Sequence, residues 1–181
     1  MGIMNPWHDV EIGDKAPNIV NAIIEIPKDS KLKYELDKKT GLIKLDRFLF
    51  SAVHYPGDYG FVPRTYWEDN DPLDIIILTN RSAAYPLTLV EARIIGVIRM
   101  IDNGEKDDKI IAVYESDPRY KEYQNINDVP KHYLEELKHF FETYKELEGK
   151  KCKILEFLPK EAAMKDVKAA QEMYNKKFKK K

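Results

Sequence analysis

The chain has 181 residues, a length that fits one domain, and we expect residues 1–181 to form a single domain. Apolar residues make up 43% of the sequence, which is enough for a hydrophobic core and excludes wholesale disorder. Lys plus Arg total 30 and Asp plus Glu total 31, so the net charge of −1 excludes a globally basic nucleic-acid binder.

The first part of the chain is typical of β-structure. Residues 18–27 are rich in Ile and alternate loosely, which predicts a strand that ends at Pro27. Residues 33–36 and 42–48 predict a hairpin, because Gly41 between them can adopt the positive φ of a tight turn. Further strands are predicted at residues 73–79, 89–101 and 110–114.

The apolar pattern then changes to a helical period. Residues 130–148 predict a helix, which Asn127 or Asp128 can cap and Gly149 can end. Residues 153–158 predict one more strand, and residues 161–178 a second helix. Strands followed by helices predict an α+β fold, in which two helices pack against a small antiparallel sheet or barrel.

The sequence also limits the compartment. Cys152 is the one cysteine, so the chain can form neither an internal disulfide nor a zinc site of several cysteines, and we expect a buried, apolar role for it. The longest aliphatic run, Ile75 to Leu78, is far shorter than the ~20 residues that span a bilayer. The first residues carry no apolar signal-peptide core. We therefore expect a cytoplasmic protein without a membrane partner.

One acidic segment stands out, the sequence DNDPLD at residues 69–74. On extended backbone Asp69 and Asp71 would share one face, ~6.6 Å apart along the strand. Pro72 would redirect the chain, so that Asp74 could turn back toward the same space. Converging carboxylates repel one another, and a divalent cation removes that cost. Ligation by oxygen alone suits hard ions, and Mg²⁺ above all.

Two other interpretations of this segment must be weighed. An isolated Asp-rich turn is most often only a solvated turn. A calcium-binding EF-hand fails on spacing, because Asp74 stands where that loop needs Gly and Asn80 where it needs Glu. A second acidic loop at residues 102–108 favours the metal site, although a charged hairpin turn would have the same composition.

With these segments in view, the chain closely resembles the family I soluble inorganic pyrophosphatases. The six-residue acidic motif matches that family in full. Supporting segments follow in the family's order: IEIP around Glu25, KYE at residues 33–35, DRF around Arg47, YPGDYG at residues 55–60 and GVIRMID ending at Asp102. The resemblance is strong from residue 18 to residue 148. It is to the prokaryotic type, and we expect an archaeal source.

The resemblance implies a fold, an activity and an assembly. The fold would be a five-stranded OB-like β-barrel with flanking α-helices. The activity would be hydrolysis of pyrophosphate to two orthophosphates by a metal-activated hydroxide, with several Mg²⁺ ions in each active site. The chain would assemble as a homohexamer.

The resemblance also implies residue roles. Asp69, Asp74 and Asp102 would hold one activating metal, and Asp102 with Asp107 a further one. Asp71 would be a ligand to the attacking water and its general base. The implied metal set is Glu25, Glu35, Asp69, Asp71, Asp74, Asp102 and Asp107. The implied phosphate-binding set is Lys33, Arg47, Lys109, Tyr144 and Lys145. Tyr55 would tune the attacking water by hydrogen bonding, with Tyr59 as a neighbour.

Two other functions compete with this one. An OB-type nucleic-acid-binding module without catalysis could use Trp67, Tyr55, Tyr59 and the Lys-rich residues 176–181, although carboxylates on the binding face oppose it. A phosphatase acting on nucleotides or polyphosphate could use the same metals. Phosphate release that depends on Mg²⁺ would favour an enzyme, and a substrate panel would separate the two enzymes.

Overall fold

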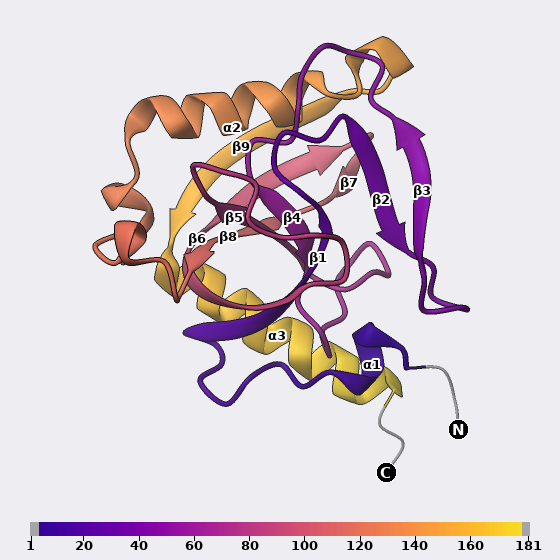
Figure 1. The fold of residues 1–181 in the computed structure, drawn as a ribbon, viewed down its shortest axis with the longest axis vertical. Coiled ribbons are helices and arrows are strands. Elements are labelled where there is room, and N and C mark those ends of the chain that lie inside the picture. Colours follow the sequence, from indigo (N-terminus) through magenta and orange to yellow (C-terminus); the bar gives the residue numbers. More distant parts are fainter. Residues whose placement is uncertain (1–3, 179–181) are drawn as a thin grey trace.

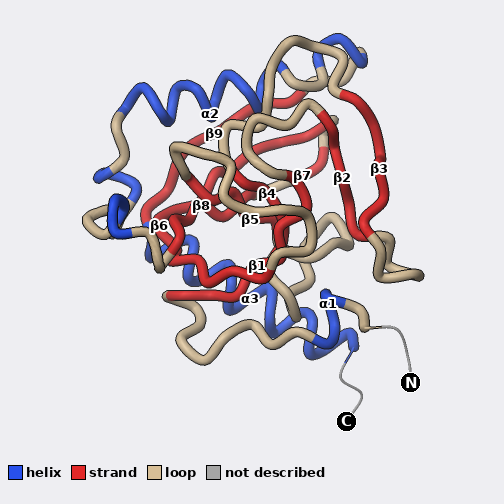
Figure 2. Tube along the Cα trace, viewed as in Figure 1, coloured by secondary structure: helices blue, strands red, loops and turns tan. Residues whose placement is uncertain are grey.

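The strands build a sheet that closes into a ring in the computed structural model, which describes residues 4–178 (Figures 1 and 2). The ring runs through β1 (Ile19–Ile26), β4 (Asp58–Phe61), β5 (Asp74–Leu78), β8 (Lys109–Tyr114) and β6 (Leu89–Asp102), and β6 pairs with β1 to close it. Of these pairs, β5–β8 is parallel and the others are antiparallel. The predicted strands are thus confirmed, but β4 was not predicted, and the parallel β5–β8 pair corrects the expected antiparallel sheet.

The longest strand, β6, makes the closure possible. It pairs with β1, with β8, with the short β7 (Glu105–Lys106) and with β9 (Cys152–Pro159). Register shifts near Gly96 and Arg99 bend it, as β-bulges do. A side chain at Gly96 would come within 2.8 Å of the Leu158 carbonyl oxygen, so the close approach of β9 requires glycine there.

Beside the ring stands the predicted hairpin of β2 (Leu32–Leu36) and β3 (Ile43–Phe48), at the right of Figure 1. Its turn contains Gly41 at φ 70°, as the sequence predicts. Lys33 lies opposite Arg47 while Tyr34 lies opposite Leu45, so Asp46 is the extra residue of a bulge. The hairpin therefore places charged residues out of strict alternation.

Helices cover two opposite sides of the ring (Figure 1). They are α2 (Lys131–Thr143) and α3 (Lys160–Phe178), with the short α1 (Pro6–Asp9) beside the end of α3. Short 3-10 turns occur at η1 (Pro118–Tyr120), η2 (Ile126–Asp128) and η3 (Glu146–Glu148). None of the helices within residues 4–178 is long and apolar enough to cross a membrane.

The predicted helix at residues 130–148 needed correction. Helix α2 stops at Thr143, η3 follows it, and Gly149 ends η3 at φ 73°. The predicted caps Asn127 and Asp128 instead lie in η2, whose cap is Asn125, and α2 starts after Pro130 without a side-chain cap. Local capping propensity did not reveal that a separate turn precedes the helix.

The ring strands β1, β4, β5 and β8 bury both of their faces, which explains the continuous apolar runs among them. On β5, Ile75 and Ile77 belong to the core cluster under α3, whereas Ile76 and Leu78 belong to the cluster under α2. From α3, Ala163, Val167 and Ala170 join the first cluster; from α2, Leu137, Phe140 and Phe141 join the second. Packing on both faces holds β5 in place, and with it Asp74 at the start of the strand.

Candidate active site

A cavity of about 570 Å³ opens between the hairpin and the ring. Its lining includes twelve of the thirteen residues that the sequence predicts for the site: Glu25, Lys33, Glu35, Tyr55, Asp69, Asp71, Asp74, Asp102, Asp107, Lys109, Tyr144 and Lys145. Arg47 stands outside this lining set. The fold thus gathers side chains from both sheets, two loops and the segment after α2.

At one edge of the cavity lie Asp69, Asp74 and Asp107, which we call the acidic triad. A carboxylate oxygen from each of the three lies within 4.8 Å of the others. Asp74 starts β5 and is in register with Lys109 at the start of the parallel strand β8, so the two strands bring their leading residues to one edge. Asp69 reaches the same point from the preceding loop.

The acidic triad carries more negative charge than its one buried cation balances. The Lys109 ammonium lies 2.8 Å from Asp74 and 2.8 Å from Asp107, and the Tyr59 hydroxyl donates to Asp74 at 2.5 Å. Burial, reinforced by Asp74 and Asp107, raises the pKa of Asp69 to about 7. Burial also raises the pKa of Asp107. An all-oxygen set with surplus negative charge fits a hard divalent cation.

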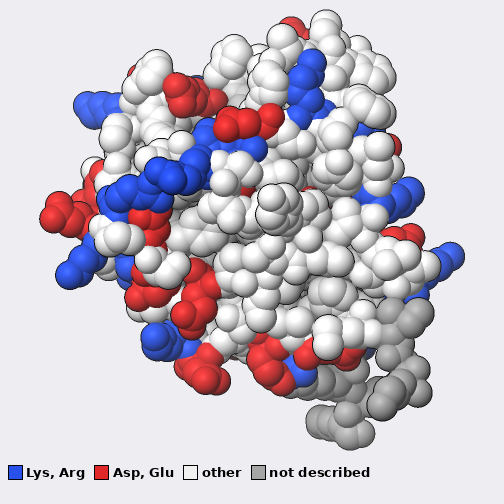
Figure 3. Space-filling view, in the orientation of Figure 1, with Lys and Arg blue, Asp and Glu red and all other residues white. Residues whose placement is uncertain are grey.

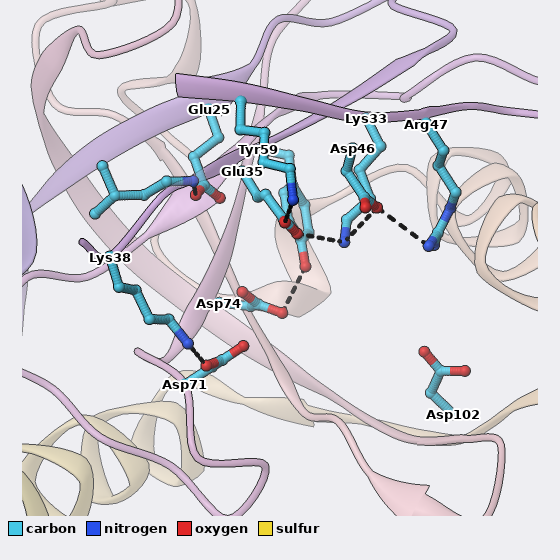
Figure 4. Close-up of polar contacts among 12 residues, drawn as sticks. Glu25, Lys33, Glu35, Lys38, Asp46, Arg47, Tyr59, Asp71, Asp74 and Asp102 are labelled. Atoms are coloured by element: carbon cyan, nitrogen blue, oxygen red, sulfur yellow. Dashed lines mark hydrogen bonds and ion pairs between the residues drawn. The ribbon is translucent and has the colours of Figure 1, made fainter. Parts of the chain in front are cut away.

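The structure groups Asp107 with Asp69 and Asp74, where the resemblance implied Asp102. Asp102, at the end of β6, pairs with Lys145, and Figure 4 shows it apart from Asp71 and Asp74. Although burial acts to raise the pKa of Asp102, the Lys145 ammonium outweighs it and the pKa falls. Spacing along the chain could not separate two aspartates that flank one turn.

Cys152 is not the buried apolar residue that we expected. It is only partly buried, and its thiol donates to the Asp102 carboxylate at 3.3 Å. Burial, together with Asp102, raises the pKa of the Cys152 thiol to about 12.

Asp71 lines the cavity, and its backbone N–H donates to the Asp69 carboxylate at 3.1 Å, but its own carboxylate does not join the acidic triad. The extended backbone expected here is wrong, because residues 68–71 form a turn with Asn70 at φ 70°. The side chain of Asp71 is half exposed and forms an ion pair with Lys38 (Figure 4). Lys38, in the turn of the hairpin, was not predicted, since no local pattern distinguishes it from the neighbouring Lys39.

Two glutamates line the wall formed by β1 and β2. Glu25 is buried and accepts a hydrogen bond from the Leu36 backbone N–H at 2.7 Å, and burial raises its pKa to about 8. Glu35 lies 3.4 Å from the Lys33 ammonium and 3.8 Å from that of Lys44. Glu25 can therefore gain a cation partner, while Glu35 already has two.

Two of the predicted phosphate-binding cations, Lys33 and Arg47, belong to a chain of ion pairs along the hairpin (Figure 4). Asp46 lies 3.4 Å from Lys33 Nζ and 3.2 Å from Arg47 Nη1. Arg47 Nε lies 3.3 Å from Glu148, and its buried Nη2 has no hydrogen-bond partner within residues 4–178. Asp46 and Glu148 were missed, because the bulge at Asp46 breaks the alternation on which the prediction relied.

Three buried tyrosines complete the walls. Burial raises the pKa of Tyr55, Tyr59 and Tyr144, so each hydroxyl remains protonated and able to donate. Tyr144 follows α2 directly and precedes Lys145, so the end of that helix delivers both side chains to the cavity, as expected.

Comparison with known proteins identifies the family. The family model described as inorganic pyrophosphatase matches residues 22–175. The chain belongs to the inorganic pyrophosphatase family. It is 52% identical to soluble inorganic pyrophosphatase 1 of Arabidopsis thaliana, over 94% of this chain and 80% of that one. It is 51% identical to the soluble inorganic pyrophosphatase of Zea mays, over 94% and 79%.

Solved structures of inorganic pyrophosphatases also share the fold. The enzyme from Thermus thermophilus superimposes with a TM-score of 0.91 at 42% identity, over 95% of this chain and 99% of that one. The enzyme from Helicobacter pylori gives a TM-score of 0.87 at 41% identity, over 92% and 98%. These relatives are from plants and bacteria, so the expected archaeal source is not borne out.

The nucleic-acid alternative is not favoured. Trp67, Tyr55 and Tyr59 are at most 9% exposed, so their rings cannot stack with bases. On the face shown in Figure 3, the basic side chains have acidic ones directly beside them, and a broad uncharged area occupies the centre. Of the Lys-rich end, residues 179–181 lie outside the described part, and Lys177 packs on the ring of Tyr66.

Proposed function

We propose that this member of the inorganic pyrophosphatase family hydrolyses pyrophosphate to two orthophosphates with Mg²⁺ as its cofactor. The observation that carries this proposal is the acidic triad, whose surplus negative charge lies in the same cavity as the cations Lys33, Lys109 and Lys145. A bare acidic cavity would repel a polyanionic substrate, so the site needs cations before it can bind one.

The carboxylate oxygens of the cavity fit that cofactor. Asp69, Asp74 and Asp107 would hold one ion, and Asp102, Asp71, Glu25 and Glu35 stand around the same cavity for further ions. Mg²⁺ bound there supplies a lowered pKa for water and neutralises charge on the phosphates.

Asp71 is the proposed general base. It lies at the cavity mouth, where a water can reach it, and its partner Lys38 sits on the hairpin turn. Once Asp71 releases Lys38, its carboxylate can accept a proton from the attacking water. The buried Tyr55 hydroxyl would orient that water by donating a hydrogen bond.

The phosphate-binding residues exchange partners when the site fills. Lys33 and Lys145 are now paired with Glu35 and Asp102, carboxylates that we place among the metal ligands. When those carboxylates turn to cations, both ammonium groups become free for phosphate oxygens. Arg47 would donate hydrogen bonds to a phosphate oxygen from its unpaired Nη2. Lys109 and Tyr144 would donate to phosphate from the floor of the cavity.

Three wider properties belong to the same proposal. We assign the closed five-stranded ring to the OB-like barrels, supported by β6 pairing back to β1. We place the protein in the cytoplasm, supported by its one free cysteine. We expect a homohexamer, supported by exposed apolar side chains such as Phe48 and Phe50, which a second subunit could cover.

Release of orthophosphate from pyrophosphate tests the proposal. We expect release with Mg²⁺ and none with excess chelator. No release under either condition would contradict it. Faster release from polyphosphate or nucleoside triphosphates than from pyrophosphate would instead favour the broader phosphatase.

A further inference from the structure

The turn that supplies Asp107 and Lys109 to the site is held from behind by a second ionic cluster. Asp108, between them in sequence, turns to the opposite side, where it pairs with Arg99 of β6, and Arg99 in turn pairs with Asp166 of α3. We propose that Arg99 and Asp166 are positioning residues that, through Asp108, fix Asp107 and Lys109 for metal binding. This inference rests on the proposed function of the site.

The contacts of Asp108 are directional. One carboxylate oxygen accepts from Arg99 Nη1 at 2.7 Å, and the other from the Met100 backbone N–H at 3.3 Å. The Asp107 N–H donates to the Met100 carbonyl oxygen at 3.0 Å. Side chain and backbone together tie this short segment to β6 just before β8 begins.

Helix α3 holds the other end of the cluster. Arg99 Nη2 donates to Asp166 Oδ1 at 3.1 Å, and Nη1 lies 2.7 Å from Asp166 Oδ2. The side chains of Asp108 and Asp166 are 9% and 12% exposed. The helix therefore contributes no side chain to the cavity, yet it anchors one of the cavity's walls.

Successive residues explain why this anchor matters to the triad. Asp107 and Lys109 face the cavity and contact each other at 2.8 Å, while Asp108 faces α3. A rotation of the segment that released Asp108 would turn both neighbours away from Asp74. A buried ion pair adds little stability compared with apolar side chains, because desolvation opposes it. The contribution of this cluster is therefore to fix the position of the segment around Asp108.

The test is Mg²⁺ binding by calorimetry without pyrophosphate, beside the Mg²⁺ dependence of phosphate release. Arg99→Met is expected to weaken Mg²⁺ binding by about 10-fold, as loss of a ligand's supporting contact does. Arg99→Lys keeps the charge but loses the planar guanidinium group. Its Mg²⁺ affinity should therefore lie between those of the parent protein and Arg99→Met. The matched control is Arg93→Met, because Arg93 lies on the same strand, is 7% exposed and pairs with Glu115 away from the site.

The outcomes separate this inference from the proposed function. Unchanged Mg²⁺ affinity in Arg99→Met, or an equal loss in Arg93→Met, would overturn the positioning role. A parent protein that binds no Mg²⁺ and releases no phosphate would overturn the function itself. If Arg99→Met does not fold, Asp166→Asn takes its place, because in that variant Arg99 keeps its ion pair with Asp108. We expect Asp166→Asn to weaken Mg²⁺ binding by a smaller factor. An unchanged Mg²⁺ affinity in this variant would overturn the inference.

Discussion

Two carboxylates at opposite ends of the β4–β5 pair have different surroundings. Asp58 lies opposite Ile77, and Asp74 lies opposite Phe61 at the other end. Asp58 is fully buried and accepts hydrogen bonds from the Lys28 N–H at 2.7 Å, the Ala83 N–H at 3.3 Å and the Tyr114 hydroxyl. Asp74 is more exposed, yet two further carboxylates crowd it.

The contrast shows where folding satisfies a charge and where it does not. Around Asp58 all the contacts that we describe come from donors, so the folded chain supplies what a buried carboxylate needs. Around Asp74 the chain supplies one ammonium and one hydroxyl for three carboxylates. The first end stabilises the fold, and the second needs a cation from outside.

The largest expected effect is on turnover, at the end of the β4–β5 pair that carries the acidic triad. Asp71→Asn should lower kcat by ~10²–10⁴, because the amide cannot accept a proton from water. Phosphate release at saturating Mg²⁺ measures it. The control is Asp29→Asn, since Asp29 also forms an exposed ion pair, with Lys28, away from the cavity. Turnover like that of the parent protein would remove Asp71 as the base.

Next comes a crossed pair of substitutions at the two ends. Asp69→Asn should weaken Mg²⁺ binding by at least about 10-fold, while the metal-free protein keeps or gains stability at pH 8 because one crowded charge is removed. Asp58→Asn should lower the free energy of unfolding by about 2–3 kcal/mol and leave Mg²⁺ affinity unchanged. Calorimetry and denaturant unfolding measure the two quantities. Equal changes in Mg²⁺ affinity and in the free energy of unfolding for both variants would contradict the difference between the two ends of the β4–β5 pair.

Lys33→Ala should act on substrate binding. Loss of a charge-assisted hydrogen bond to phosphate raises KM by about 10-fold, with a smaller change in kcat. Steady-state kinetics measure the split, and Lys44→Ala is the control because Lys44 also pairs with Glu35 but is more exposed. If KM and kcat were both unchanged, Lys33 would not belong to the site.

The last prediction changes no residue and concerns the pH dependence of stability. The pKa of Asp69 is about 7 in the folded protein against 3.8 ordinarily, and that of Glu25 about 8 against 4.5. The folded state thus binds more protons between pH 4 and 8, so the metal-free protein should lose stability as pH rises through that range. Saturating Mg²⁺ should reduce the loss. We would measure the unfolding midpoint of the metal-free protein from pH 5 to pH 8. A midpoint that stays constant or rises would contradict the raised pKa values of Asp69 and Glu25.

Local pattern predicted much of this molecule and failed at identifiable places. Period-two and helical spacing found most of the strands and both long helices, since each buries a regular apolar face, but it missed the short strands β4 and β7. The motif at residues 69–74 found the acidic loop. It could not show that Asn70 takes a positive φ, which sends Asp69 to the triad and Asp71 to the mouth.

The remaining misses depend on tertiary structure. The parallel pairing of β5 with β8 decides that Asp107 joins Asp74, and the bulge at Asp46 decides which cations meet along the hairpin. Lys38, Glu148 and the anchor formed by Arg99 with Asp166 reach their partners across elements far apart in sequence. These contacts depend on the tertiary structure, so they could not be predicted from a single sequence.

A crystal soaked in Mn²⁺, used as a stand-in for Mg²⁺ with a measurable anomalous signal, tests directly whether the acidic triad binds a divalent cation. We expect an anomalous peak bounded by carboxylate oxygens of Asp69, Asp74 and Asp107. We expect none beside Asp58. A saturating soak in which the three carboxylates move apart without a peak between them would contradict it.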